Sequence, residues 1–142
     1  MKRVFADTAY WLATFSPRDQ WRGAALRARG DIGDCLLMTT DEVLTEFLTG
    51  VAGGGPYTRR MAASLVRRVL CSPAVAVVPQ SRETLLAGLA LYEGRPDKSY
   101  SLTDCISMET MRREGLVDVL TNDRHFQQEG FRVLLVEPGG SA

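Results

Sequence analysis

The sequence is poor in the residues that build metal clusters and disulfide frameworks, since its 142 residues include three cysteines and one histidine. Cys35, Cys71 and Cys105 lie far apart and form no C-x-x-C pair. A scattered, odd-numbered set of this kind indicates reduced thiols in a cytoplasmic protein, and it excludes a disulfide scaffold and a cysteine-based zinc site. The single histidine excludes a histidine-rich metal site.

Long hydrophobic runs and an excess of positive charge are also missing. No stretch approaches the roughly 20 apolar residues of a membrane span, so we expect no membrane contact. Lys2 and Arg3 are followed by an acid at Asp7, which argues against a signal peptide. The 17 basic residues balance the 17 acidic ones, which argues against broad electrostatic binding of nucleic acid but allows a local basic rim.

Short runs of branched apolar residues are present, and they predict strands of a parallel sheet. Most of these runs are almost continuously apolar, which is typical of strands buried on both faces. Helical segments lie between them, as in an α/β fold. The length fits one domain, which we expect over residues 1–137, with a frayed tail over 138–142. The predicted strands are Arg3–Ala6, Cys35–Thr39, Ala74–Val78, Val117–Leu120 and Arg132–Val136.

Helix boundaries follow from capping residues and glycines. Ser16 and Pro17 predict a helix that begins with Ser16 as its N-cap and ends before Gly30. Another helix is expected to begin near Thr40 and to end at Gly50. Further helices are predicted over residues 8–15, 57–70, 82–92 and 102–114, with a single turn over 124–129.

Four acidic residues occupy comparable positions in this pattern. Asp7 follows the first predicted strand, and Asp123 follows the fourth. Asp104 lies in the first turn of the helix before that fourth strand, and Glu46 lies one turn inside the helix after the second strand. Ligand sites of parallel α/β sheets form at the carboxyl ends of the strands, so the four acids can converge in one cleft.

Clustered carboxylates repel one another, and a hard divalent cation removes that conflict. Mg²⁺ or Mn²⁺ prefers oxygen ligands, activates water and stabilises the charge of a phosphodiester transition state. Each acid also has a simpler explanation: Asp104 suits a helix start, Asp7 and Asp123 suit turns, and Glu46 suits a solvated helix face. The spacing alone leaves both interpretations open.

Three segments resemble the motifs of PIN-domain ribonucleases, most of all the VapC toxins of toxin–antitoxin pairs. Residues 4–8 resemble the opening strand of that family, with an acid followed by a hydroxyl residue. Residues 39–46 resemble its second strand and helix. Residues 100–107, followed by 120–126, resemble its two C-terminal acidic motifs. Order and spacing match along nearly the whole chain.

The resemblance implies an acidic quartet of Asp7, Glu46, Asp104 and Asp123 that binds metal and carries catalysis. Glu42 lies one turn before Glu46 on the same helix face and is the alternative to it. Other polar residues near the quartet are implied to orient carboxylates or water, or to contact a phosphate. The first group is Thr8, Thr103 and Asn122; the second is Arg124 and His125, for which a surface arginine and a turn histidine are equally good explanations.

The family further implies a three-layer α/β/α sandwich with a mostly parallel, about five-stranded central sheet. It implies hydrolysis of single-stranded RNA by metal-activated water, with Mg²⁺ or Mn²⁺ as cofactor, a homodimer, and a small antitoxin protein that covers the cleft. Trp11, Leu12, Phe15 and Trp21 are candidates for an apolar antitoxin groove, and core packing explains them equally well. A housekeeping RNA-processing PIN nuclease and a non-catalytic module that binds nucleic acid or protein on the same fold are the alternatives.

Overall fold

The computed structural model describes residues 1–137, in which five parallel strands form one sheet. The order of the strands across the sheet is β3-β2-β1-β4-β5, so the first strand of the chain is the central one. The predicted parallel α/β fold is therefore confirmed. The strands are β1 (Lys2–Ala6), β2 (Cys35–Thr40), β3 (Val75–Val78), β4 (Asp118–Leu120) and β5 (Arg132–Val133).

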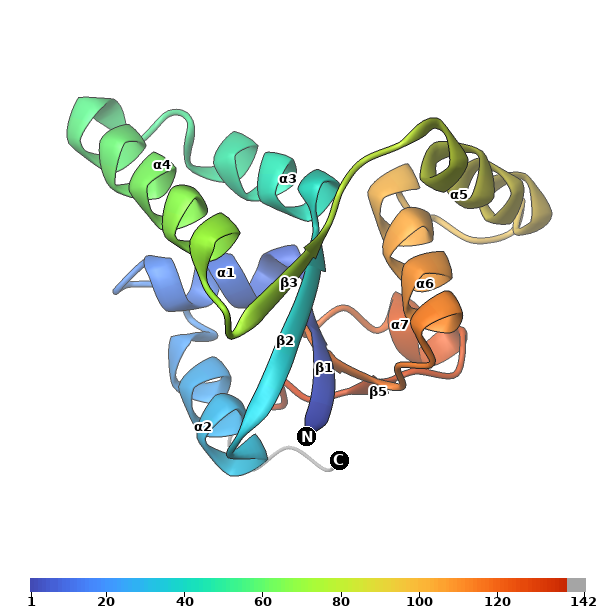
Figure 1. Cartoon of the computed structure of the whole chain (residues 1–142), viewed down its shortest axis with the longest axis horizontal. Helices are drawn as coiled ribbons and strands as arrows, with labels where there is room; N and C mark the ends of the chain where they lie inside the picture. The colour runs from blue at the N-terminus through green and yellow to red at the C-terminus, as the bar shows by residue number, and fades with distance from the viewer. Residues whose placement is uncertain (138–142) are drawn as a thin grey trace.

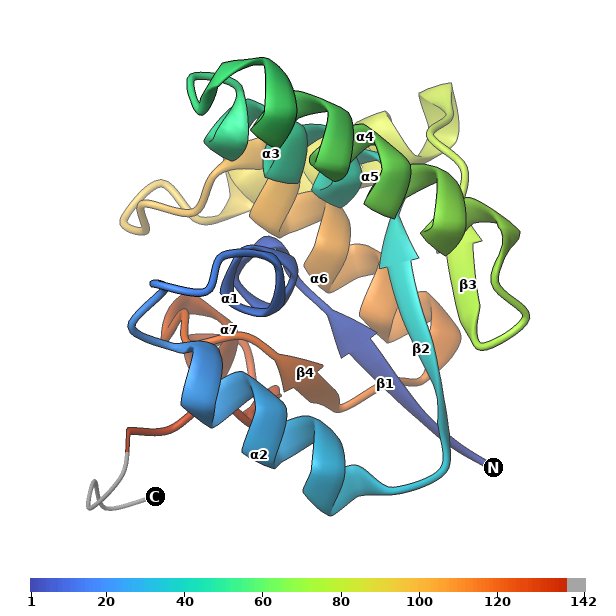
Figure 2. The same ribbon diagram turned by 90° about the vertical axis from the view of Figure 1, so that its left-hand side faces the viewer.

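The helices complete three layers. Four helices lie on one side of the sheet and three on the other (Figure 1). The first four are α1 (Thr8–Phe15), α2 (Arg22–Ile32), α3 (Asp41–Val51) and α4 (Gly55–Cys71), and the other three are α5 (Arg82–Gly94), α6 (Leu102–Glu114) and α7 (His125–Gln128). In the view turned by 90°, α3, α4 and α5 lie beyond the carboxyl ends of β1 and β2 (Figure 2).

The central strand explains why the predicted strands are continuously apolar. Val4, Phe5 and Ala6 of β1 are fully buried, because both faces of the sheet are covered. Phe5 lies in register with Met38 of β2 on one side and with Val119 of β4 on the other. The carboxyl ends of β1 and β4 therefore lie next to each other at the same edge of the sheet.

The predicted helix start at Ser16 is wrong. Residues 16–21 form turns, and α2 begins only at Arg22. The Asp19 carboxylate accepts a hydrogen bond from the backbone N–H of Trp21 at 2.7 Å, and this local bond competes with helix formation. The helix also continues past Gly30, because the positive φ of 72° that ends it belongs to Gly33.

Two further expectations concern packing. Trp11 is buried, so core packing explains it, whereas Leu12, Phe15 and Trp21 are partly buried against the core and their role in an antitoxin groove stays a prediction. The last strand is shorter than predicted, although the backbone N–H groups of Leu134 and Leu135 still donate to neighbouring carbonyls. The expected tail over 138–142 lies outside the described residues. No helix within residues 1–137 is long and apolar enough to cross a membrane.

Candidate active site

All four acids lie near the carboxyl edge of the sheet. Asp7 directly follows β1 and is the N-cap of α1, and Asp123 lies between β4 and α7. Glu46 comes from α3, and Asp104 comes from the first turn of α6. Burial raises the pKa of Asp7 and of Asp104, and neighbouring charges add to it: those of Asp104 and Glu46 at Asp7, and those of Asp123 and Glu46 at Asp104. The fold therefore brings together four acids that lie far apart in the sequence.

Asp7 is the most deeply buried acid of this cluster, with 5% of its surface exposed. Its Oδ2 accepts a hydrogen bond from the Thr121 hydroxyl at 2.9 Å, whereas Oδ1 is buried and has no hydrogen-bond partner within residues 1–137. Burial, reinforced by the charges of Asp104 and Glu46, raises the pKa of Asp7 to about 7, although hydrogen bonds from Thr8 and Thr121 oppose the shift. The metal-free protein therefore binds a proton at this carboxyl group near neutral pH.

The structure distinguishes Glu46 from Glu42. Thr8 Oγ1 donates a hydrogen bond to Glu46 Oε1 at 2.5 Å. The residue that follows Asp7 in the chain therefore holds the Glu46 carboxylate. Glu42 instead lines an open cavity between α3, α5 and α6. The geometry therefore favours Glu46 as the fourth acid of the cluster.

Asp104 and Asp123 share a histidine. Ser101 and Asp104 form a capping box, in which Asp104 Oδ2 accepts from the Ser101 backbone N–H at 3.0 Å. Asp123 Oδ1 accepts from the backbone N–H of His125 at 2.9 Å. His125 Nδ1 lies 3.2 Å from Asp123 Oδ1 and 3.8 Å from Asp104 Oδ2. Asp104, Asp123 and His125 offer ligand atoms that all lie within 4.8 Å of one another.

The orientation of the His125 ring is set by a loop between α5 and α6. Ser99 Oγ lies 3.2 Å from His125 Nε2, and the Tyr100 ring packs 5.2 Å from the imidazole ring. Nδ1 is buried and, within residues 1–137, has no partner at hydrogen-bonding geometry. Asp7 Oδ1 and His125 Nδ1 are thus two buried polar atoms without a hydrogen-bond partner within residues 1–137.

This donor set fits a divalent cation with a preference for oxygen. Carboxylate oxygens are the ligands that suit Mg²⁺ or Mn²⁺, whereas imidazole is a more usual ligand of zinc, iron, nickel or copper. Within residues 1–137, Asp104, Asp123 and His125 bring ligand atoms within 4.8 Å of one another, and Asp7 and Glu46 are not in that group. No lysine or arginine within the described residues forms an ion pair with Asp7, Glu46, Asp104 or Asp123. Asp7 Oδ1 has no hydrogen-bond partner within residues 1–137, and burial raises the pKa of this carboxyl group to about 7, so the ionised form of Asp7 is unfavourable unless a positive charge lies beside it.

The other predicted residues are placed less uniformly. Thr8 contacts the cluster through Glu46, and His125 contacts Asp123. Thr103 lines the neighbouring cavity, Asn122 is half-buried, and Arg124 is exposed. None of these last three side chains hydrogen-bonds to an acid of the cluster in the part of the chain that the structure describes.

Sequence reasoning missed Thr121. Its hydroxyl donates to Asp7 Oδ2 and accepts from the backbone N–H of Asp123 at 3.2 Å, so it links two acids from different strand ends. The available signal was a hydroxyl residue directly after a buried strand and two residues before an acid, the arrangement of a local side-chain turn.

Comparison with known proteins gives a fold and no closer assignment. No family model matches the sequence, and no curated protein matches it. Among solved structures, a Mycobacterium tuberculosis protein described as VapC20, a sarcin–ricin-loop-cleaving toxin, is similar, with a TM-score of 0.81 and 24% identity over 91% of this chain and 96% of that one.

Two further structures show the same arrangement. FitAcB from Neisseria gonorrhoeae has a TM-score of 0.65 at 16% identity and covers 92% of this chain and 96% of its own. FitAB bound to an IR36 DNA fragment has a TM-score of 0.64 at 16% identity, covering 92% of each chain. The chain therefore has the fold of a VapC-type toxin, as the resemblance of its motifs predicted.

Proposed function

We propose that this protein is a metal-dependent endoribonuclease that hydrolyses single-stranded RNA and acts as the toxin of a toxin–antitoxin pair. One observation carries the proposal: a buried carboxyl group, Asp7, lies near three other acids, and its Oδ1 has no hydrogen-bond partner in the part of the chain that the structure describes. Such a cluster is unfavourable alone and becomes favourable when a divalent cation binds it.

Asp7, Glu46, Asp104 and Asp123 are the residues that would hold Mg²⁺ or Mn²⁺. When bound, the ion lowers the pKa of a coordinated water and stabilises the negative charge that develops on the phosphate. The protein contributes orientation: the Thr8 hydroxyl fixes Glu46, and the backbone N–H of Ser101 fixes Asp104.

The substrate and the partners rest on the fold and on the resemblance of the motifs. A similar structure belongs to a toxin described as cleaving the sarcin–ricin loop, which supports RNA as the substrate class. Exposed Arg124 and half-buried His125 lie beside Asp123, and we propose that they contact an RNA phosphate. We also propose a homodimer, a small antitoxin that covers the acids, and a cytoplasmic location.

The test is cleavage of a single-stranded RNA by the purified protein in millimolar Mg²⁺ or Mn²⁺ and in excess chelator. We expect cleavage with metal only. Asp7→Asn, Asp104→Asn and Asp123→Asn should each abolish cleavage without loss of fold, whereas the exposed control Asp34→Asn should cleave at the wild-type rate. Undiminished cleavage in chelator, or activity in all three site variants, would overturn the proposal. Growth arrest on expression, relieved by a small protein encoded beside the gene, tests the toxin role separately.

A further inference from the structure

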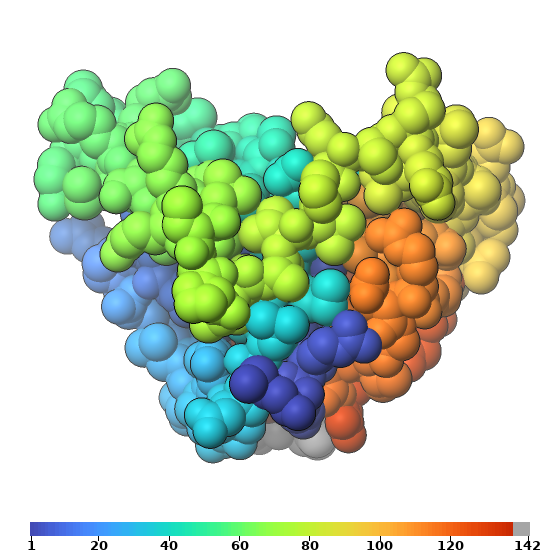
Figure 3. Space-filling model, in the orientation of Figure 1, coloured from blue at the N-terminus to red at the C-terminus, as the bar shows by residue number. Residues whose placement is uncertain are grey.

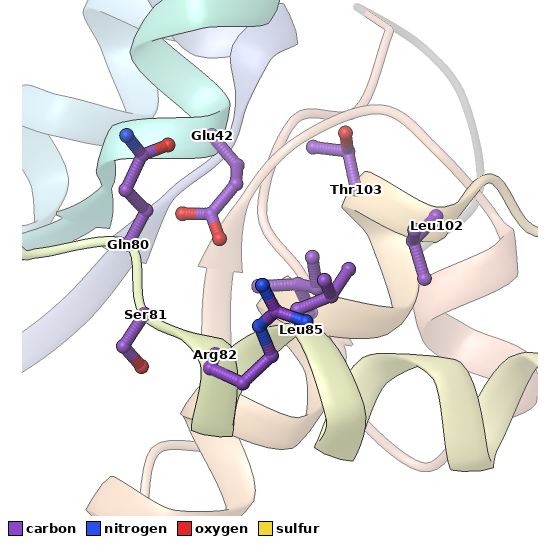
Figure 4. A pocket seen from close by; sticks show the side chains of 8 residues that line it. Glu42, Gln80, Ser81, Arg82, Leu85, Leu102 and Thr103 are labelled. Atoms are coloured by element: carbon purple, nitrogen blue, oxygen red, sulfur yellow. The ribbon is translucent and has the colours of Figure 1, made fainter.

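An open cavity of about 480 Å³ adjoins the acidic cluster between α3, α5 and α6. The space-filling view shows the molecule hollowed between α3 and α5 (Figure 3). Apolar side chains of Leu85, Leu102 and Ile106 line part of the cavity. The remaining lining is polar and comes from Glu42, Gln80, Ser81, Arg82 and Thr103 (Figure 4).

The cavity lies directly beside the acids on two of its walls. On α3, Glu42 lies one helical turn from Glu46, which corresponds to about 5–6 Å between side-chain origins. On α6, Thr103 is the neighbour of Asp104. A molecule whose phosphate lies at the acids can therefore place its next group in this cavity.

Two opposite charges face the cavity without neutralising each other. The Glu42 carboxylate and the Arg82 guanidinium point into it from different walls (Figure 4). Over residues 1–137, neither side chain forms an ion pair or a side-chain hydrogen bond, although the neighbouring Asp41 carboxylate accepts from the Gln80 backbone N–H at 2.9 Å. The Glu42 carboxylate is thus available as a hydrogen-bond acceptor on one wall, and the N–H groups of the Arg82 guanidinium are available as donors on the other.

The walls that carry these two charges are held rigidly. The bond from Gln80 to Asp41 ties the segment before α5 to α3, and Ser81 and Thr84 form a capping box at the start of α5. Gly88 allows α5 to approach α6 closely, since a Cβ there would lie 2.4 Å from Ile106 Cγ1. A cavity with fixed walls needs little reorganisation when a ligand binds.

We propose that this cavity binds a guanine base of the RNA, in the nucleotide next to the cleaved phosphate, and that Glu42 and Arg82 determine this specificity. The inference rests on the proposed function. Guanine presents the donors N1–H and N2–H₂ on its Watson–Crick edge and the acceptors O6 and N7 on its Hoogsteen edge. A carboxylate on one side and a guanidinium on the other match these two edges, while the apolar side chains contact the ring faces.

The other bases fit this pair less well. Uracil and adenine each offer a single donor group to a carboxylate, and cytosine presents its donor and its acceptors on the same edge. Arginine pairs bidentately with O6 and N7 of guanine, and a carboxylate pairs bidentately with N1–H and N2–H₂. Only guanine uses the full hydrogen-bonding capacity of both Glu42 and Arg82.

The first experiment is cleavage of a single-stranded RNA pool, randomised in sequence, with the 5′ ends of the products sequenced. We expect wild-type protein to prefer guanine at one fixed position beside the cut. Glu42→Gln and Arg82→Gln should each reduce that preference about tenfold, since a bidentate base contact discriminates by this order. The control Glu83→Gln, next to Arg82 but lining a different groove, should keep the preference. A wild-type cleavage pattern without guanine, or one that both variants retain, overturns the proposal.

The second experiment does not depend on cleavage. Guanosine, adenosine, cytidine and uridine 5′-monophosphates are titrated in chelator into the isotope-labelled protein, and the backbone amide signals are followed by NMR. Guanosine monophosphate should shift the signals of Gln80, Leu85 and Thr103 more strongly than the other three nucleotides do, and Glu42→Gln should reduce this difference. Equal shifts by all four nucleotides overturn the guanine assignment. If guanosine monophosphate binds selectively but no RNA is cleaved, the proposed nuclease activity fails while the base site stands.

Discussion

Replacing Asp7 by asparagine should stabilise the metal-free protein at alkaline pH. The folded protein holds the Asp7 proton up to a pKa of about 7, whereas the unfolded chain releases it near the ordinary value of 3.8. The folded state therefore binds more protons than the unfolded state between these two values, and its stability falls as pH rises through this window. Above pH 7 the carboxyl group is ionised in both states, and the full cost of the buried charge remains.

The size of the effect follows from the shift. A rise from 3.8 to about 7 corresponds to roughly 4 kcal/mol of unfolding free energy lost by pH 8.5. Asparagine removes the charge with almost no change of volume, and its carbonyl can still accept from Thr121. Its amide N–H₂ group lies where Asp7 Oδ1 has no partner, which costs about 1–3 kcal/mol. We therefore expect Asp7→Asn to be about 1–3 kcal/mol more stable than wild type at pH 8.5.

Asp118 is the matched control, because it is buried to the same 5% exposure as Asp7. Hydrogen bonds from Arg132 lower its pKa against the opposing effect of burial, and Lys2 adds a second positive charge. Asp118→Asn should therefore lose roughly 1.5–3 kcal/mol at pH 5 and pH 8.5 alike, because the charge-assisted bonds are present at both. Two buried aspartates should thus respond to the same substitution with opposite signs at pH 8.5.

The assay is urea unfolding in chelator at pH 5 and pH 8.5, for wild type and both variants. The quantity of interest is the difference between variant and wild type, since other titrating groups cancel in it. At pH 5 the gain from Asp7→Asn should vanish or reverse, because wild-type Asp7 is then protonated. The reasoning is refuted if Asp7→Asn is less stable than wild type at pH 8.5, or if the difference does not change between the two pH values.

Three further perturbations have defined outcomes. Asp104→Asn should raise the metal-free melting temperature and reduce the further rise caused by millimolar Mg²⁺. The gain in unfolding free energy is smaller by about 0.3–1 kcal/mol, because the variant loses a favourable charge in the first turn of α6. Equal metal-induced rises in mutant and wild type would exclude Asp104 from the cluster. Burial raises the pKa of Glu129, but two arginines and a tyrosine outweigh it and lower the pKa to about 2, so its stabilisation is full above pH 4.5 and is lost as pH falls toward 2. Glu129→Gln should be about 2–3 kcal/mol less stable than wild type at pH 7, and its unfolding free energy should not show the loss between pH 4.5 and pH 2 that Glu129 causes in the wild type. Gly88→Ala should cost about 1–3 kcal/mol in urea unfolding despite the better helix propensity of alanine, because its Cβ meets Ile106; a stabilised variant would show that α5 can move away from α6.

The fold was predictable because its sheet is buried on both faces. Runs such as 3–6 and 35–39 carry no alternation, and that pattern is characteristic of parallel strands. Once the strands are parallel, their carboxyl ends must share an edge, so the neighbourhood of Asp7 and Asp123 followed from position alone. The prediction failed at residues 16–21, where the hydrogen bond that Asp19 accepts from the backbone N–H of Trp21 outweighs the capping pattern of Ser16 and Pro17.

The finer geometry depended on contacts that local patterns do not record. Glu42 and Glu46 lie on one helix face, and only the docking of α3 against Thr8 directs Glu46 into the cluster. The role of Thr121 could be predicted only with the knowledge that β1 and β4 are neighbours in the sheet, although more than a hundred residues separate them in the sequence. The cavity lies between α3 and the consecutive helices α5 and α6, and Glu42 and Arg82 are 40 residues apart in the sequence, so their opposed positions became visible only in the fold.

The way this chain treats its buried acids bears on the proposed metal site. Glu129 is paired with Arg95 and Arg112, and Asp118 is paired with Lys2 and Arg132, so each of these acids has two protein cations. Asp7 is as buried as Asp118, yet no lysine or arginine within residues 1–137 pairs with it. A fold with fifteen arginines available can neutralise a buried acid with its own side chains where the acid serves the structure. Within residues 1–137 no such cation neutralises Asp7, and we propose that a divalent cation held by Asp7, Glu46, Asp104 and Asp123 supplies the positive charge instead.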